Sequence, residues 1–348
     1  MVVTRRSIEE DFYSLSSQVK RRVLGLRVGK DYFGKIYWNV HSIIKLRNII
    51  KNEKPDVVVG MMTNAGIISL VANFFLKSKV VVSERNYPGH KKVNFIWGLL
   101  RRYLYKYASA HAVQTDGVRK WLLEYSSAKN IFLVPNPVVY PLPCHKPIIE
   151  PSTFISSEDK VVLAVGSKLY QKGYDLLLES FVCFLSHFAD IKEKHRWKLV
   201  VLGLSSDEDR ANGSEKVLQE LAVKLDIETQ LILPGRVGNL SAWYERSDIF
   251  AMTSRYEGFP NVLLEAMAHG CFVVSFDCMT GPSDIIRHEE NGLLVKAEDT
   301  AAFGEALYRA VSEKELFAKC KKNAKSVIED YSVERTSSNW LEMFDRLV

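Results

Sequence analysis

The chain has 348 residues, 47% of them hydrophobic and 25% charged, which suits two globular domains of about 150 residues each and excludes a low-complexity or repeat protein. Its longest apolar stretch starts at Ala65 and runs for about a dozen residues, short of the roughly 20 that span a bilayer, so we expect no membrane-spanning helix. Residues 1–150 carry 24 Lys and Arg against 10 Asp and Glu, a net charge of +14, whereas residues 151–348 carry 23 against 31, a net −8. The basic half would suit nucleic acid, anionic lipid headgroups or a phosphorylated substrate, as well as an ordinary solvated surface.

Short β-branched runs alternate with amphipathic runs in the first half of the chain. The expected elements are, in order, a helix over 39–54, a strand over 56–61, a helix over 64–77, and strands over 79–85 and 110–115. Such alternation predicts a parallel sheet with helices on both faces. Residues 134–160 follow with six prolines and no sustained period, and we interpret the segment as an interdomain linker.

The same alternation resumes in the second half and predicts a second doubly wound α/β domain. The expected strands cover 161–167, 197–204, 229–237, 248–254, 271–276 and 291–295, and the expected helices follow Gly173, cover 214–226, start near Pro260, and cover 300–320 and 332–348. We divide the chain into an N-terminal domain over 1–140, a linker over 141–159, a C-terminal domain over 160–331 and a final helix over 332–348. Two such domains face a cleft, and ligands of open α/β sheets bind at the carboxyl ends of the strands.

The stretch "SRYEGFPNVLLEAMAHG", residues 254–270, places two glutamates on either side of a helix start. Pro260 suits the first turn of a helix, so the helix is expected to begin at Pro260 or Asn261. The free backbone N–H groups of that first turn form an anion site at the carboxyl end of the preceding strand, suited to a diphosphate.

Glutamates beside an anion site are poor partners for phosphate itself, because like charges repel, but they are good acceptors for sugar hydroxyls. We therefore expect Glu265 to accept from ribose hydroxyls and Glu257 from those of a transferable sugar. In the alternative interpretation, one acid complements the helix dipole and the other is a solvated helical residue.

Lys172 and Gly173 stand at another helix start, directly after the strand "VVLAV". A lysine there can neutralise the charge that develops on a departing diphosphate, and Lys168 could assist it. Arg236, in "LPGRVGN", could also reach the diphosphate while the backbone near Val237 meets the base. Surface positions remain the alternative for each of these cations. The glycine pattern is not GxGxxG, so the sequence predicts no dinucleotide cofactor.

Four motifs together carry a family resemblance. "EGFPNVLLE" resembles the EX7E motif of the retaining GT-B glycosyltransferases of family 4, and "KGYDLLLESF", "LPGRV" and "GPSDIIRHEENGLLV" stand in that family's order and spacing over nearly the whole chain. The resemblance implies two Rossmann-like domains facing a cleft, with the nucleotide-sugar donor bound by the C-terminal domain and the acceptor by the N-terminal one. It also implies retention at the anomeric carbon, catalysis without a metal ion or cofactor, and a final helix over 332–348 that packs back on the N-terminal domain.

On this resemblance the catalytic residues are Glu257 and Lys172. The donor-binding residues are Gly166, Lys168, Arg236, Val237, Gly258, Phe259, Pro260, Asn261 and Glu265. The chain departs from the family in two places. It has Gly166, Ser167 and Lys168 where the family reads Gly-Arg-Leu, and it opens with "MVVTRR", which resembles the family's second strand, so we expect an N-terminal domain that lacks its first βα unit.

The acceptor side is expected in "SERNYPGHKK", where Arg85 and Asn86 follow a strand. Residues 91–107, "KKVNFIWGLLRRYLYKY", interleave basic and apolar residues, as does a helix that meets anionic lipid headgroups, although packing against the sheet would explain part of its apolar face. Five scattered cysteines without a CxxC pair indicate reduced thiols. We therefore predict a cytoplasmic enzyme, peripheral on the inner face of the cell membrane, that does not bind nucleic acid.

The sequence as a whole predicts a retaining glycosyltransferase that moves a hexose or N-acetylhexosamine from a nucleotide diphosphate sugar, with a UDP-sugar favoured. Its acceptor is a hydroxyl of a glycan linked to a lipid diphosphate, in the assembly of a surface polysaccharide or glycoprotein glycan. Two alternatives stay open: a non-catalytic homologue or fragment that still binds the nucleotide sugar, and a sugar-nucleotide epimerase, which the EX7E context fits less well.

Overall fold

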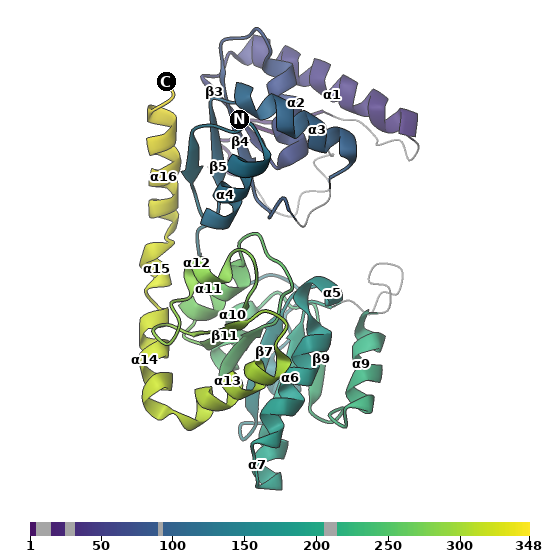
Figure 1. The fold of residues 1–348 in the computed structure, drawn as a ribbon, viewed down its shortest axis with the longest axis vertical. Coiled ribbons are helices and arrows are strands. Elements are labelled where there is room, and N and C mark those ends of the chain that lie inside the picture. Colours follow the sequence, from purple (N-terminus) through teal and green to yellow (C-terminus); the bar gives the residue numbers. More distant parts are fainter. Residues whose placement is uncertain (5–14, 25–31, 90–92, 205–213) are drawn as a thin grey trace. The chain divides into compact units, whose positions relative to one another are not determined.

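The computed structural model describes residues 1–4, 15–24, 32–89, 93–204 and 214–348 (Figure 1). Contacts divide the chain into two compact units. Unit 1 contains residues 1–113, 119–133 and 341–348, and unit 2 contains residues 114–118 and 134–340. Each unit is built around its own parallel β-sheet, as the alternating pattern predicts. None of the described helices is long and apolar enough to cross a bilayer.

Unit 1 holds a four-stranded parallel sheet in the order β3-β4-β5-β6. The strands are β3 (Val57–Met61), β4 (Lys79–Glu84), β5 (Ala110–Val113) and β6 (Ile131–Leu133), and the helices are α1 (Tyr32–Glu53), α2 (Thr63–Asn73), α3 (Phe95–Leu104) and α4 (Asp116–Tyr125). The central strands are buried apolar runs, as expected for a parallel sheet covered by helices. The sequence analysis predicts β3 to β5 with α1 and α2, whereas α4 and the short β6 are not among the predicted elements.

A second, two-stranded parallel sheet in unit 1 pairs β1 (Val2–Thr4) with β2 (Arg21–Val23). It is separate from the four-stranded sheet within the described residues. A cavity of about 360 Å³ is lined by residues of both sheets, among them Val3 of β1 and Val59 of β3. The N-terminal strand pair therefore lies across a space from the edge of the main sheet.

Unit 2 holds a six-stranded sheet in the order β12-β11-β10-β7-β8-β9, with every pair parallel. The strands are β7 (Lys160–Val165), β8 (Trp197–Leu202), β9 (Leu231–Gly235), β10 (Ile249–Met252), β11 (Phe272–Asp277) and β12 (Leu293–Lys296). The main helices are α6 (Tyr174–Ser186), α9 (Ser214–Lys224), α10 (Leu240–Arg246), α11 (Asn261–Ala268), α13 (Thr300–Ser312) and α14 (Lys314–Ala324), and the short ones are α5 (Leu169–Lys172), α7 (Ile191–Arg196), α12 (Pro282–Ile285) and α15 (Val327–Asp330). The last helix, α16 (Val333–Asp345), begins in unit 2, and its residues from Leu341 on belong to unit 1.

Two hydrophobic clusters cover the two faces of this sheet. Alternate residues of β7 belong to different clusters: Val162 packs with α6 and α13, whereas Val161 and Leu163 pack with α10 and α11. Successive side chains of a strand point to opposite faces, so helices cover both sides of the sheet. This is the doubly wound arrangement that the sequence predicts, and its strand order reverses between β7 and β10, the point at which such sheets bind ligands.

The proline-rich segment before β7 packs on unit 2. Val138 and Ile155 are buried in the cluster that contains α10 and α11. The carbonyl oxygen of Ile149 accepts hydrogen bonds from Trp243 Nε1 at 2.9 Å and from Asn239 Nδ2 at 3.1 Å. The segment contributes to the core of unit 2 although its sequence has no regular period.

Candidate functional site

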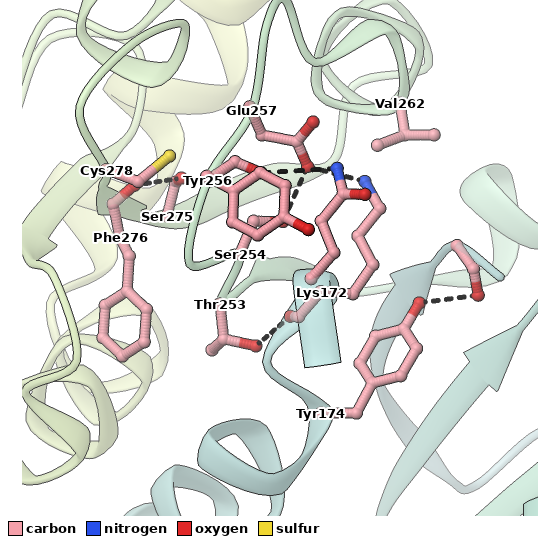
Figure 2. Close-up of polar contacts among 12 residues, drawn as sticks. Lys172, Tyr174, Thr253, Ser254, Tyr256, Glu257, Val262, Ser275, Phe276 and Cys278 are labelled. Carbon is pink, nitrogen blue, oxygen red and sulfur yellow. Dashed lines mark hydrogen bonds and ion pairs between the residues drawn. The ribbon is translucent and has the colours of Figure 1, made fainter. Parts of the chain in front are cut away.

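Two loops leave the sheet of unit 2 where the strand order reverses, and each carries one of the predicted catalytic residues. The loop after β7 leads into α5 and Lys172, and the loop after β10 leads through Glu257 into α11. Lys172 Nζ lies 2.7 Å from Glu257 Oε1, with 15% and 8% of the two side chains exposed. Figure 2 shows the two side chains meeting from their separate segments.

The Glu257 carboxylate is fixed by further contacts. Ser254 Oγ donates to Oε1 at 2.7 Å, so one oxygen receives both Lys172 and Ser254. Thr280 Oγ1 donates to the Glu257 carbonyl oxygen at 2.6 Å and holds the backbone. The other carboxylate oxygen, Oε2, accepts no hydrogen bond from the residues that the structure describes. A positioned carboxylate oxygen with spare lone pairs can accept from a hydroxyl of a ligand.

The Lys172 side chain lies along the backbone at Gly166. A Cβ added at Gly166 would stand 2.5 Å from Lys172 Cε and 2.8 Å from Cγ, closer than side chains pack. Tyr174 Oη donates to the Gly166 carbonyl oxygen at 2.9 Å. Burial, and next the charge of Glu257, raise the pKa of Tyr174, so its hydroxyl keeps its proton as a donor. Gly166 therefore makes room for the lysine stem that reaches Glu257.

The corner between α5 and α6 depends on Gly173. Its φ is 62°, in the left-handed region, and an added Cβ would stand 2.1 Å from the Thr253 carbonyl oxygen. Thr253 Oγ1 in turn donates to the carbonyl oxygens of Lys172 and Gly173 at 3.1 and 3.0 Å. The segment that carries Lys172 thus lies against the end of β10 with no space for a side chain.

Replacing Gly173 with alanine is expected to lower both stability and activity. The left-handed backbone costs an alanine about 1–2 kcal/mol, and the contact with Thr253 must be relieved by moving the segment of Lys172. Thermal unfolding and the rate of the reaction proposed below measure the two effects. Gly98→Ala is the control for stability and should not lower the melting temperature, since its added Cβ would meet only Val93 Cγ2 at 3.8 Å. Equal melting temperatures and rates for Gly173→Ala and the unaltered protein would contradict this account.

Glu265 lies one turn into α11 and is largely buried. Tyr244 Oη donates to its Oε2 at 3.0 Å. Burial raises the pKa of Glu265 above its usual value. The hydrogen bond from Tyr244 and the charge of Lys172 lower the pKa but do not outweigh burial. His269 Nδ1 lies 2.8 Å from the Glu265 carbonyl oxygen and its Nε2 lies 3.0 Å from Ser241 Oγ, so this histidine is fixed at the end of the helix.

The N-terminus of α11 is shaped by packing rather than by a cap. The helix begins at Asn261, as predicted, and no side chain of the described residues caps it. Asn136 Nδ2 donates to Asn261 Oδ1 at 2.8 Å, and the Phe259 ring packs 5.8 Å from that of Tyr331. Because no side chain caps α11, the backbone N–H groups of its first turn are the kind of donors that bind an anion.

A glycine allows the next loop to approach that N-terminus. Gly281 has a φ of 103°, and a Cβ there would stand 2.6 Å from Pro260 Cδ and 3.5 Å from the Gly258 carbonyl oxygen. Asp284 Oδ2 accepts from the Gly281 backbone N–H at 3.1 Å. The motif "GPSDII" thus lies against the loop that carries Glu257.

Other predicted residues lie apart from the Lys172–Glu257 pair. Lys168 is exposed before α5, Arg236 is exposed after β9, and Val237 packs on the cluster of α10 and α11. Within the described residues, neither Lys168 nor Arg236 forms a hydrogen bond with Lys172 or Glu257.

The predicted acceptor-side residues belong to unit 1. Asn86 Nδ2 lies 3.5 Å from Met62 Sδ, and burial lowers the pKa of Arg85. Both follow β4, whose last residue, Glu84, is buried and accepts hydrogen bonds from Thr63 Oγ1 at 2.9 Å and from Tyr105 Oη. This buried carboxylate anchors the start of the loop that carries them.

Sequence reasoning missed several side chains that build the site. They are Tyr174, Asp175, Tyr244, Thr253, Ser254, Arg255 and Thr280. Ser254 and Arg255 stand within the same short stretch as Glu257, and Asp175 stands three residues after Lys172, so closeness to the motifs was the available signal. Arg255 and Asp175, however, are each other's partners across 80 residues of the chain. No group of three or more His, Cys, Asp or Glu in the described part of the chain could hold a metal ion.

Comparisons with known proteins agree with this architecture. A glycosyltransferase of Haemophilus influenzae is 27% identical over 317 residues, which cover 89% of this chain and 80% of that protein. The Campylobacter jejuni protein named GalNAc-alpha-(1->4)-GalNAc-alpha-(1->3)-diNAcBac-PP-undecaprenol alpha-1,4-N-acetyl-D-galactosaminyltransferase is 26% identical over 336 residues, 96% of this chain and 87% of its own length.

Solved structures show the same fold. Anabaena HepE in complex with UDP superposes with a TM-score of 0.74 and 14% identity over 94% of this chain and 86% of its own. The fold is GT-B, with a parallel sheet in each of two Rossmann-like domains. The family model described as glycosyl transferases group 1 matches residues 145–327, more than half of the chain. The chain therefore belongs to the family of group 1 glycosyl transferases.

Proposed function

We propose that this chain is a retaining glycosyltransferase that moves a hexose or N-acetylhexosamine from a UDP-sugar to a hydroxyl of a glycan linked to a lipid diphosphate. The observation that carries the proposal is the Lys172–Glu257 pair at the reversal of strand order in unit 2. Ligands of open α/β sheets bind at this point. The spacing of Glu257 and Glu265 supports membership of family 4 through its EX7E motif.

The donor is proposed to bind along the first turn of α11. Its uncapped amides suit the diphosphate, Glu265 accepts from ribose hydroxyls, and Glu257 Oε2 accepts from a hydroxyl of the sugar. UDP is the favoured nucleotide because HepE binds UDP in its crystal structure. Gly166, Gly258, Phe259 and Pro260 are proposed to border the donor, and Arg236, whose side chain is exposed, to contact the diphosphate.

In the proposed reaction, the bond between the anomeric carbon and the diphosphate oxygen breaks and a bond from the same carbon to the acceptor oxygen forms on the same face. The acceptor proton passes to the departing diphosphate oxygen, which leaves a nucleoside diphosphate and the extended glycan. Lys172 stabilises the charge on the leaving group and Glu257 positions the sugar. With a lysine in this role, the proposed reaction needs no metal ion or cofactor.

The acceptor is proposed to bind unit 1, with Arg85 and Asn86 as contacts. Its class is suggested by the C. jejuni relative, whose name specifies an undecaprenol-diphosphate-linked glycan. A chain acting on such a lipid would work in the cytoplasm at the inner face of the membrane.

The helix α3 is proposed to contact the anionic membrane surface. Phe95 is 80% exposed and Leu99 45%, with the exposed cations Arg102 and Lys106 beside them. Lys91 and Lys92 of the same predicted stretch lie outside the described residues.

Replacing both Phe95 and Leu99 with serine is expected to weaken binding to phosphatidylglycerol vesicles at least about tenfold, because each large side chain contributes apolar area to the lipid boundary. Vesicle flotation measures the binding. Ile191→Ser, at a position 69% exposed on α7, is the matched control and should leave it unchanged. Equal flotation of the double variant and the unaltered protein would refute contact through α3.

The proposed activity is tested by mass spectrometry of lipid-diphosphate-linked glycans incubated with the chain and a panel of UDP- and GDP-sugars, with and without EDTA. We expect addition of one sugar from a UDP donor, undiminished by EDTA, and NMR of the product should show the donor's anomeric configuration. Binding of a UDP-sugar without transfer to any acceptor would instead support the non-catalytic alternative.

A further inference from the structure

Two segments that carry the proposed catalytic pair are joined along their length. One is residues 170–175, which span the end of α5 and the start of α6, and the other is residues 253–257, which follow β10. The Arg255 backbone N–H donates to the Gln171 carbonyl oxygen at 2.9 Å, and Gln171 Nε2 lies 3.4 Å from the Tyr256 carbonyl oxygen. Thr253 adds its two hydrogen bonds at the corner. The Lys172–Glu257 ion pair is therefore one of several interactions that join the two segments.

Arg255 makes the strongest of these contacts. Its Nη1 and Nη2 donate to the two carboxylate oxygens of Asp175 at 2.8 and 2.6 Å, and Nη1 also donates to the Tyr170 carbonyl oxygen at 2.9 Å. The guanidinium lies 4.4 Å over the Tyr170 ring, and only 13% of the Arg255 side chain is exposed. Bidentate arginine–carboxylate pairs fix geometry as well as charge.

Arg255 and Asp175, both in unit 2, neutralise each other's charge. Burial raises the pKa of Asp175, but the hydrogen bonds and charge of Arg255 outweigh it and hold that pKa below its usual value. The same hydrogen bonds raise the pKa of Arg255. An arginine two residues before Glu257 would suit a diphosphate by sequence position alone. Here the guanidinium group of Arg255 is paired with Asp175, so Arg255 stabilises the loop instead.

We propose that Arg255 and Asp175 are positioning residues, which hold the loop of Glu257 against the segment of Lys172 and so set the geometry of the catalytic pair. This inference rests on the proposed function of that pair. Arg255 stands two residues before Glu257, and Asp175 stands three residues after Lys172, so their contact bridges the same two segments. A displacement of about 1 Å in a reacting group can cost about a hundredfold in rate.

Kinetics of Arg255→Ala test the proposal. We expect the kcat for sugar transfer to fall about 10- to 100-fold with little change in KM for the donor, and Arg255→Lys to restore only part of it, since lysine lacks the fork. In a background that already carries Lys172→Met, the same change should cost at most about twofold, because Arg255 acts through the pair. Arg309→Ala is the control: Arg309 also pairs with carboxylates, Glu289 and Glu313, and should keep the original rate.

Hydrogen–deuterium exchange gives a readout that does not depend on activity. Arg255→Ala and Asp175→Asn should each speed exchange in peptides covering 253–260 and 168–173, whereas Arg309→Ala should not. Unchanged exchange and unchanged kcat in both variants would overturn the positioning role. A loss of kcat that is fully additive with Lys172→Met would also overturn it, because it would show an effect independent of the pair. If no donor is turned over but the loop exchanges faster in both variants, the proposed reaction fails while the structural link stands.

Discussion

Glu257→Gln is expected to reduce the rate of sugar transfer by about 10²–10³-fold while the fold is kept. Glutamine keeps the shape of the side chain but removes the negative charge that Lys172 and Ser254 hold in place at 2.7 Å. It also presents an amide where a sugar hydroxyl is proposed to find a carboxylate acceptor. The initial rate of nucleoside diphosphate release, measured at saturating donor and acceptor, gives the effect.

A change at Asn261, the first residue of α11, separates this role from general damage to the loop. Asn261→Ala removes the exposed contact with Asn136 but leaves Glu257 and its donors intact. We expect it to raise the KM for the donor with a much smaller change in kcat. A Glu257→Gln protein that folds normally and transfers sugar within about threefold of the original rate would remove Glu257 from the catalytic role.

Lys172→Met should lower kcat by about 10²–10³-fold, the usual cost of removing one group that stabilises developing negative charge in a water-poor site. Methionine retains an apolar stem along Gly166, so the packing there is largely kept. What is lost is the positive charge at Nζ, which lies 2.7 Å from Glu257 Oε1 on a side chain that is 15% exposed.

Lys172→Arg is the companion variant for this prediction. It keeps the positive charge but needs more space than the stem over Gly166 allows, so we expect partial activity, between those of Lys172→Met and the unaltered protein. If Lys172→Met keeps the original kcat, another cation, Lys168 or Arg236, must stabilise the leaving group.

Much of the fold could be predicted from the sequence because its buried strands are short β-branched runs. β7, β8 and β11 read as continuous apolar segments, and each lies between helices on both faces as that pattern requires. The helix start at Asn261 could be predicted from the proline before it. Short elements such as β6 and α12 are defined by tertiary contacts and leave no pattern in their own residues.

The residues of the candidate site also fall into those that the sequence predicts and those that only tertiary contacts define. Lys172 and Glu257 could be found because each stands at a helix start after a buried strand, and the doubly wound topology then brings those two strand ends together. Arg255 and Asp175, which hold them, could not be found in the sequence. They are 80 residues apart, and arginine and aspartate are both common at protein surfaces. The Tyr244–Glu265 hydrogen bond likewise depends on how α10 packs beside α11.

The most direct test of the central claim, that the Lys172–Glu257 pair carries out sugar transfer, is the rate of UDP release from the preferred UDP-sugar with and without the lipid-linked acceptor. The account predicts release that depends on the acceptor, matches the sugar gained by the glycan one for one, and nearly disappears in Glu257→Gln. Release of the same size in the original protein and in Glu257→Gln, or release of free sugar without any gain by the glycan, would contradict it.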